Sequence, residues 1–118
     1  MNKYVMRICL KNKRITLNRA MIKALGNPTH LNFLYDEDAE RLFFVPAEKD
    51  ELDAFEIPQG FWTRPRSACV ICRIAFLQML VIKANIEADS KYLYHGAYKK
   101  TEDFSAVVFN MTCGQRIR

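Results

Sequence analysis

Four cysteines and two histidines are the residues of this 118-residue chain best suited to metal or redox chemistry. Cys69 and Cys72 form a C-x-x-C pair, a spacing found in zinc sites and in redox motifs. A zinc site needs two more ligands at a matching spacing. The other ligand types occur singly along the chain, as Cys9, His30, His95 and Cys113. We therefore expect reduced thiols that pack as small hydrophobic side chains, with no metal and no cofactor.

Catalytic motifs are missing from the sequence. It contains neither the Gly-x-Ser-x-Gly pattern of a nucleophilic serine nor a glycine-rich phosphate loop. His30 and His95 are far apart along the chain, and catalysis would require both of them to line one pocket with Cys69. We expect a protein that is not an enzyme.

Positive charge is concentrated at the start of the chain. Residues 1–35 carry seven Lys and Arg side chains and no acid, whereas residues 36–57 carry nine acids and two bases. Residues 58–118 are basic again, and the net charge of the chain is +5. Clustered bases gain affinity for a polyanion by releasing its counterions. The alternative is a solvated face that the acidic segment neutralises in the folded protein.

No targeting or membrane-spanning segment is expected. Residues 1–10 alternate apolar and polar types and lack the apolar core of a signal peptide. The longest apolar stretch, 68–84, is interrupted by Arg73, Gln78 and Lys83. It is shorter than the roughly 20 apolar residues that a spanning helix needs. The prediction is a cytoplasmic protein without membrane contact.

The first elements that position these residues are a hairpin and a short helix. The period-2 pattern of Tyr4–Leu10 predicts a strand, and a polar turn at residues 11–14 leads to a second strand at Ile15–Leu17. Asn18 is expected to cap the following helix, Arg19–Leu25, by accepting a hydrogen bond from an amide of its first turn. Gly26 and Pro28 then end the helix.

The helix is predicted to be amphipathic. Met21, Ile22 and Leu25 share one face, which docks onto the core. Arg19 and Lys23 are four residues apart, so they share another face, which we expect to point outward.

A second hairpin follows. Strands are predicted at 30–35 and at 41–45, ending at Pro46, with the acidic turn 36–40 between them. Residues 47–56 form an acidic connector, and Pro58 and Gly60 mark a turn.

The long apolar stretch predicts a second helix. Residues 63–66 are a basic linker, Ser67 is a candidate cap, and residues 68–85 are apolar nearly all round. A helix of this composition must be enclosed on most sides. We expect it at the centre of the core or of a dimer.

The last elements are a third hairpin and a tail. Strands are predicted at 91–99, with a bulge at Gly96, and at 106–111. Its tyrosines, Tyr92, Tyr94 and Tyr98, share one face and could stack on bases, although cross-strand packing is the commoner use. Residues 113–118 are expected to fray.

Together these elements predict an α+β fold. It is a small β-barrel-like body of interlaced hairpins with one short and one long apolar helix and an internal pseudo-repeat. We expect a single domain, 1–118, made of a hairpin half at 1–46, an acidic-to-basic connector at 47–66, and a helix-plus-hairpin half at 67–113.

The segment Lys13–Ala47 resembles the swapped-hairpin DNA-binding module of the AbrB and MraZ families. Ile15–Asn18 stands where the family has a strand end, Ala24-Leu25-Gly26 matches the end of its helix, and Leu31–Pro46 matches its hairpin. The likeness covers about a third of the chain. It departs from the family at Lys13-Arg14, where Gly-Arg is usual, and at Asn18, where a proline is usual.

The resemblance implies binding of double-stranded DNA, with arginines reading guanine and lysines neutralising phosphates. It also implies either a homodimer or a single-chain pseudo-dimer in which the second half supplies the partner. The predicted DNA-binding residues are Arg7, Lys11, Lys13, Arg14, Arg19 and Lys23.

Two functions compete at this stage. The first is a DNA-binding transcriptional regulator or antitoxin-like protein. The second is a protein- or ligand-binding module that keeps an AbrB-like fold without binding DNA. The second predicts an exposed apolar patch beside the long helix.

Overall fold

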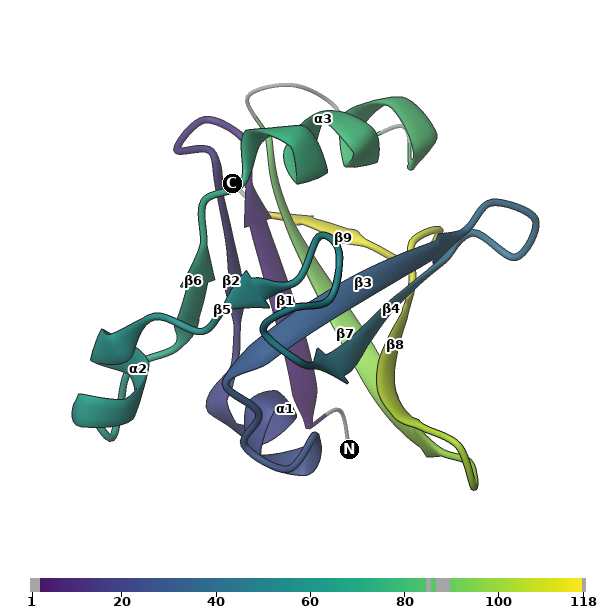
Figure 1. Cartoon of the computed structure of the whole chain (residues 1–118). Coiled ribbons are helices and arrows are strands. Elements are labelled where there is room, and N and C mark those ends of the chain that lie inside the picture. Colours follow the sequence, from purple (N-terminus) through teal and green to yellow (C-terminus); the bar gives the residue numbers. More distant parts are fainter. Residues whose placement is uncertain (1–2, 85, 87–89, 118) are drawn as a thin grey trace.

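Three antiparallel hairpins build the protein, and one of them lies between the other two. The structure, a computed structural model, describes residues 3–84, 86 and 90–117. Their strands form one curled antiparallel sheet in the order β5-β3-β4-β8-β7-β1-β2-β6, and β9 also pairs with β7. The hairpin β7–β8 from the end of the chain therefore lies between β1–β2 and β3–β4 (Figure 1). The strands are β1 (Tyr4–Cys9), β2 (Arg14–Leu17), β3 (His30–Asp36), β4 (Arg41–Ala47), β5 (Phe55–Glu56), β6 (Cys69–Ile71), β7 (Lys91–Lys100), β8 (Ser105–Asn110) and β9 (Gln115–Ile117).

The sheet curls into a half barrel whose two ends are covered by helices. Helix α1 (Arg19–Ala24) lies at one end and α3 (Ile74–Lys83) at the other, while α2 (Gln59–Thr63) lies beside β6 (Figure 1). This confirms the coarse prediction of a β-rich α+β body with few helices. Within the described residues, no helix is long and apolar enough to cross a membrane.

The core fills the inside of the curl. In β1 and β2, alternate residues point inward, and Met6, Ile8, Ile15 and Leu17 are fully buried. From α3, Phe76 packs its ring 4.0 Å from that of Phe33, centroid to centroid. At the other end, Met21, Ile22 and Leu25 of the α1 region close the core, as predicted.

Asn18 occupies the predicted cap position but does not cap the helix with its side chain. Its Oδ1 accepts a hydrogen bond from the Val5 amide, and its Nδ2 donates to the Lys3 carbonyl. The side chain therefore fastens the start of α1 to β1 instead of satisfying a free amide of the helix.

The prediction of a helix over 68–85 is wrong in its first third and in its placement. Residues 69–71 form β6, which pairs with β2, and the helix begins only at Ile74. The β-branched pair Val70-Ile71 favours a strand, and the free edge of β2 offers backbone partners that a helix would leave unused. The helix is not enclosed, because Ile74 is 56% and Ile82 is 79% exposed.

Two predictions about the last third also fail. Residues 115–117 do not fray but pair as β9 with 91–93 of β7. Gly96 keeps regular pairing with Tyr4 and Phe109 instead of forming a bulge. A Cβ at position 96 would lie 2.7 Å from the Phe109 ring, so glycine is needed there for close packing.

Candidate nucleic-acid interface

A row of basic side chains crosses the outer surface of β2, β1 and β7. Because Met6 and Ile8 point into the core, their neighbours Arg7 and Cys9 point outward. Cys9 pairs with Arg14 of β2 on one side and with Lys91 of β7 on the other. Arg7 pairs with Thr16, one step along the same surface. We call the outward residues Arg7, Arg14, Thr16 and Lys91, with Lys11 and Lys13 of the β1–β2 turn, the basic face.

The basic face contains a groove of about 350 Å³. Among the residues that the structure describes, those around the groove carry donors or neutral groups, and none of them is a carboxylate. Its lining residues are Arg7, Ile8, Cys9, Asn12, Arg14, Thr16, Lys91 and Tyr92. Arg7, Arg14 and Lys91 are all exposed, and none of them forms an ion pair with any residue that the structure describes. Three cations on one surface that form no ion pair with the described residues favour the binding of a polyanion.

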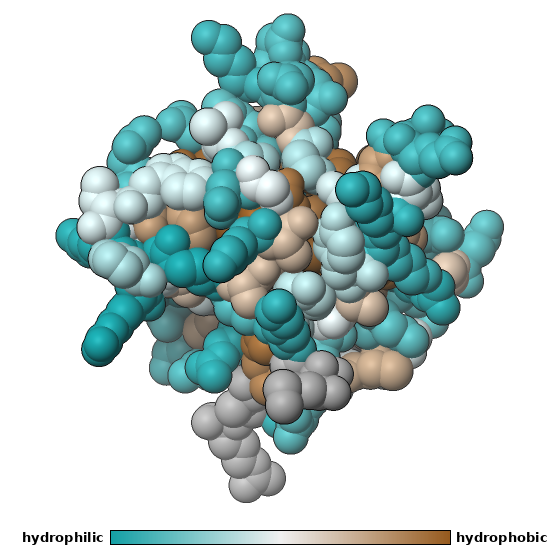
Figure 2. Space-filling model, turned by 90° about the horizontal axis from the view of Figure 1, so that it is seen from below, coloured by the Kyte–Doolittle hydropathy of each residue, from teal (hydrophilic) through white to brown (hydrophobic). Residues whose placement is uncertain are grey.

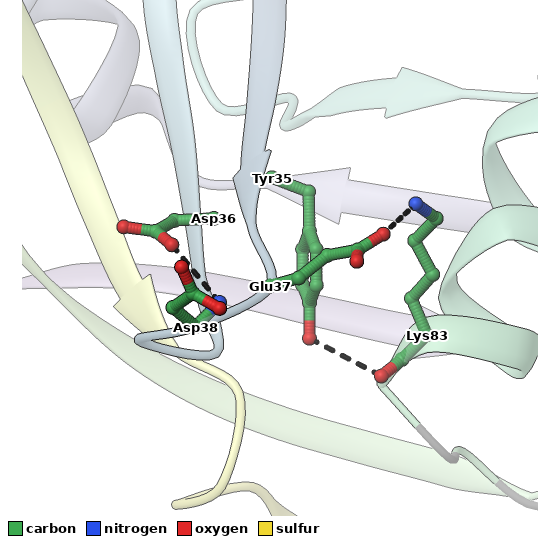
Figure 3. Close-up of polar contacts among 5 residues, drawn as sticks. All are labelled: Tyr35, Asp36, Glu37, Asp38 and Lys83. Atoms are coloured by element: carbon green, nitrogen blue, oxygen red, sulfur yellow. Dashed lines mark hydrogen bonds and ion pairs between the residues drawn. The ribbon is translucent and has the colours of Figure 1, made fainter.

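The acidic segments do not neutralise this surface. Glu37, in the turn between β3 and β4, forms an ion pair with Lys83 at the end of α3 (Figure 3). The Tyr35 hydroxyl donates to the Lys83 carbonyl at 3.4 Å and ties the same two elements together. The acidic connector is held elsewhere, because Arg73 donates to the Asp53 carbonyl at 3.1 Å. Neither acidic segment contributes a residue to the lining of the groove.

Arg19 does not face solvent, so the expectation that it lies on an outward basic face is wrong. Its Nη2 donates to the carbonyl oxygens of Phe61, Arg64 and Ser67, at 2.5, 2.8 and 3.1 Å. Its guanidinium carbon lies 3.9 Å from the centroid of the Phe61 ring. The side chain is half-buried and holds α2 and the turn after it against α1.

The other predicted residues divide between two ends of the molecule. Lys11 and Lys13 are exposed in the β1–β2 turn; they do not line the basic groove, and Lys13 lines a separate groove beside α3. Lys23 is exposed in the last turn of α1, at the opposite end, where it lines a separate hollow. The structure therefore brings together Arg7, Arg14 and the turn lysines, and it separates Arg19 and Lys23 from them.

Lys91 is the residue of this surface that we did not predict. It precedes the alternating tyrosines of β7, and its outward position follows from the same period of two. What the sequence does not reveal is that β7 pairs with β1, more than eighty residues earlier in the chain.

The cysteines are free thiols in the structure. Cys69 faces the core from β6, and burial raises the pKa of its thiol to about 11. Cys72 is exposed in the segment between β6 and α3, so the C-x-x-C pair does not lie within a helix as predicted. Among the described residues, no group of three or more His, Cys, Asp and Glu side chains could hold a metal ion.

A second surface feature is apolar. A groove of about 490 Å³ runs between α3 and the β1–β2 turn, and its lining residues are Leu10, Lys13, Ile74, Leu77, Gln78, Val81 and Ile82. The exposed apolar patch that we expected of a protein-binding module beside the long helix is therefore present.

Comparisons with protein-family models, with curated proteins and with solved structures give no match for this chain.

Proposed function

We propose that this protein binds double-stranded DNA through the basic face and acts as a non-enzymatic regulator of the transcriptional or antitoxin-like kind. One observation carries the proposal: Arg7, Arg14 and Lys91 meet on a groove that no carboxylate of the described residues lines. A surface that excludes carboxylates while it gathers exposed cations is suited to phosphate oxygens.

The β1–β2 hairpin is the element that would approach the duplex. Its two strands are flanked by β7 and β6 in the sheet, so the hairpin would meet the duplex with its outer surface and its turn. Arg7 and Arg14 are outward on these strands, where each guanidinium can bind a phosphate group with two hydrogen bonds. Lys11, Lys13 and Lys91 would neutralise phosphates on either side, which adds affinity but no sequence preference.

The proposal includes the finer architecture of interlaced hairpins with an internal pseudo-repeat. The hairpin β7–β8 lies between β1–β2 and β4, which supports a pseudo-dimer in which one chain supplies both halves. Sedimentation of the free protein and of its DNA complex tests this, because a single-chain pseudo-dimer sediments as one chain. A two-chain species in both states would favour a homodimer.

The test of DNA binding is fluorescence anisotropy of a labelled duplex over a range of salt concentrations. Arg7→Glu with Arg14→Glu should weaken binding at low salt by at least about tenfold and flatten its salt dependence. Lys49→Glu with Arg66→Glu is the matched control, because it makes the same change in net charge at exposed positions outside the groove. Equal loss in both double variants, or binding that salt does not affect, would overturn the proposal.

The apolar groove at α3 favours a second candidate, a protein-binding module. Ile82 is the most exposed apolar residue of the groove, at 79%. This candidate predicts no retention of duplex even at low salt. Under the DNA-binding proposal, Ile82→Ser should leave the affinity for duplex unchanged, so the same titration separates the two candidates.

A further inference from the structure

A hollow of about 500 Å³ opens at the end of the barrel that α1 covers. It lies at the opposite end of the molecule from α3, on the side that Figure 2 shows, where apolar residues gather at the centre and hydrophilic side chains surround them. Three elements contribute to it: the start of β1, α1 and β7. The lining residues are Lys3, Tyr4, Ala20, Lys23, Ala24 and Tyr98.

Small residues on α1 keep the hollow open. Ala20 and Ala24 are four residues apart, so they lie one turn apart on the same face of the helix. Larger side chains at these positions would fill the space. The volume is within the range of small-molecule sites.

Aromatic rings and ammonium groups line the hollow together. The rings of Tyr4 and Tyr98 lie 6.4 Å apart, centroid to centroid, with an interplanar angle of 47°. Tyr98 is 36% exposed, so a ligand can reach it. The Lys3 Nζ atom lies 5.9 Å from the centroid of the Tyr4 ring, and Lys23 borders the same space from α1. No carboxylate is among the lining residues.

We propose that this hollow binds a nucleotide, with the base packed against Tyr98 and the phosphate held by Lys3 and Lys23. Stacking on an aromatic side chain accepts any base, because every base has a π face. The two ammonium groups supply the charge that a phosphate requires. Neither an uncharged aromatic ligand nor inorganic phosphate would use both halves of the site.

This nucleotide could come from two sources. It could be a free nucleotide, or it could be an unpaired nucleotide of bound DNA, because Lys3 directly precedes the strand that carries Arg7. The site does not depend on the proposed function, since a free nucleotide can bind whether or not the basic face binds duplex.

Calorimetric titration with dAMP, deoxyadenosine and inorganic phosphate tests the site. We expect dAMP to bind at least about tenfold more tightly than either fragment, because only dAMP offers both a base and a phosphate. Tyr98→Ala should abolish this binding and Tyr98→Phe should keep it. Ala24→Leu should block the hollow without removing a charge. Arg7→Glu with Arg14→Glu should leave dAMP binding unchanged, which separates this site from the basic face.

Backbone amide chemical shifts then locate the ligand. We expect dAMP to shift the amides of α1 and of residues 96–98. Shifts confined to the basic face, or unchanged dAMP affinity in both Tyr98→Ala and Ala24→Leu, would overturn the proposal, as would the absence of dAMP binding.

A titration with DNA distinguishes a free nucleotide from an unpaired nucleotide of bound DNA. If the nucleotide comes from DNA, a duplex with a short single-stranded overhang should bind more tightly than a blunt duplex, and Ala24→Leu should remove the difference. Equal affinities of the two duplexes, together with dAMP binding, would assign the site to a free nucleotide. Loss of all duplex binding with dAMP binding intact would refute the proposed function alone.

Discussion

Arg14 and Arg19 come from the same acid-free stretch of the chain, yet they lie in two regions that use positive charge differently. On the basic face, Arg14 is exposed and forms no ion pair with the described residues. Between α1 and α2, the Arg19 guanidinium is occupied by three backbone carbonyl groups. A cation is available to a partner only where the fold offers it no acceptors, and charge counted along a sequence does not contain that information.

Replacing each arginine by alanine should show the largest difference between the two regions, measured as a change in the free energy of unfolding. Arg19→Ala leaves three carbonyls without their charged donor, so we expect a loss of about 2–3 kcal/mol in the free energy of unfolding. Arg14→Ala should change it by less than about 0.5 kcal/mol. Urea unfolding followed by circular dichroism measures both. Arg19→Lys is the control: it keeps the charge and three N–H donors but lacks the planar guanidinium that packs on the Phe61 ring, and full stability in that variant would contradict a role for this packing.

DNA affinity should show the reverse pattern. Arg14→Gln should weaken duplex binding roughly tenfold and lower the slope of log affinity against log salt by about 0.9, the value for one phosphate contact. Arg19→Lys should leave both quantities unchanged at a temperature where it is folded. A larger change in Arg19→Lys than in Arg14→Gln would reverse our assignment of the two regions.

Alkaline pH should lower the stability of the folded protein, because it favours ionisation of Tyr94 in the interior behind the basic face. Burial, with smaller contributions from Tyr92 and Tyr35, raises the pKa of Tyr94 from 10.0 to about 12. Above pH 10 the unfolded chain loses this proton more readily than the folded chain, so stability falls as the pH rises towards 12. The expected loss is about 1 kcal/mol at about pH 11. Tyr94→Phe should remove this part of the pH dependence in urea unfolding curves, and identical curves for both proteins would exclude Tyr94 as its source.

The smallest expected effect is on the rate of thiol modification. This rate compares Cys9, on the outer surface of the sheet, with Cys69, which faces the core. Exposed Cys72 and Cys113 should react first with iodoacetamide, whereas buried Cys69, with its raised pKa, should react only on unfolding. Half-buried Cys9 lies in the basic groove, so duplex should slow its modification a few-fold and leave Cys72 unaffected. Peptide mass spectrometry measures the extent of modification at each cysteine. Protection of Cys72 instead of Cys9 would place DNA elsewhere.

Local patterns predicted the local elements well. The strands β1, β3, β4, β7 and β8 and the position of α1 follow from side-chain types within a few residues of each other. The errors occur where distant segments decide the structure. Residues 69–71 are a strand because β2 leaves an edge free, and 115–117 are a strand because β8 pairs only with the second half of β7.

The candidate site was partly predictable for the same reason. Arg7 and Arg14 lie on adjacent strands of one hairpin, so a local pattern places them together. Arg19 was misplaced because its acceptors, including the Phe61 and Ser67 carbonyls, come 42 to 48 residues later. Lys91 was missed because β7 reaches β1 only through the tertiary fold.

The position of β7–β8 between the other two hairpins also bears on how the chain folds during synthesis. Tyr4 pairs with Gly96, and β4 pairs with β8, so β1 and β4 each lack one neighbouring strand until residues 91–110 have been made. Contacts this far apart in sequence favour slow folding. We expect the emerging chain to keep its first two hairpins unjoined until residues 91–110 have been made, and to gain Lys91, and with it the complete basic face, only then.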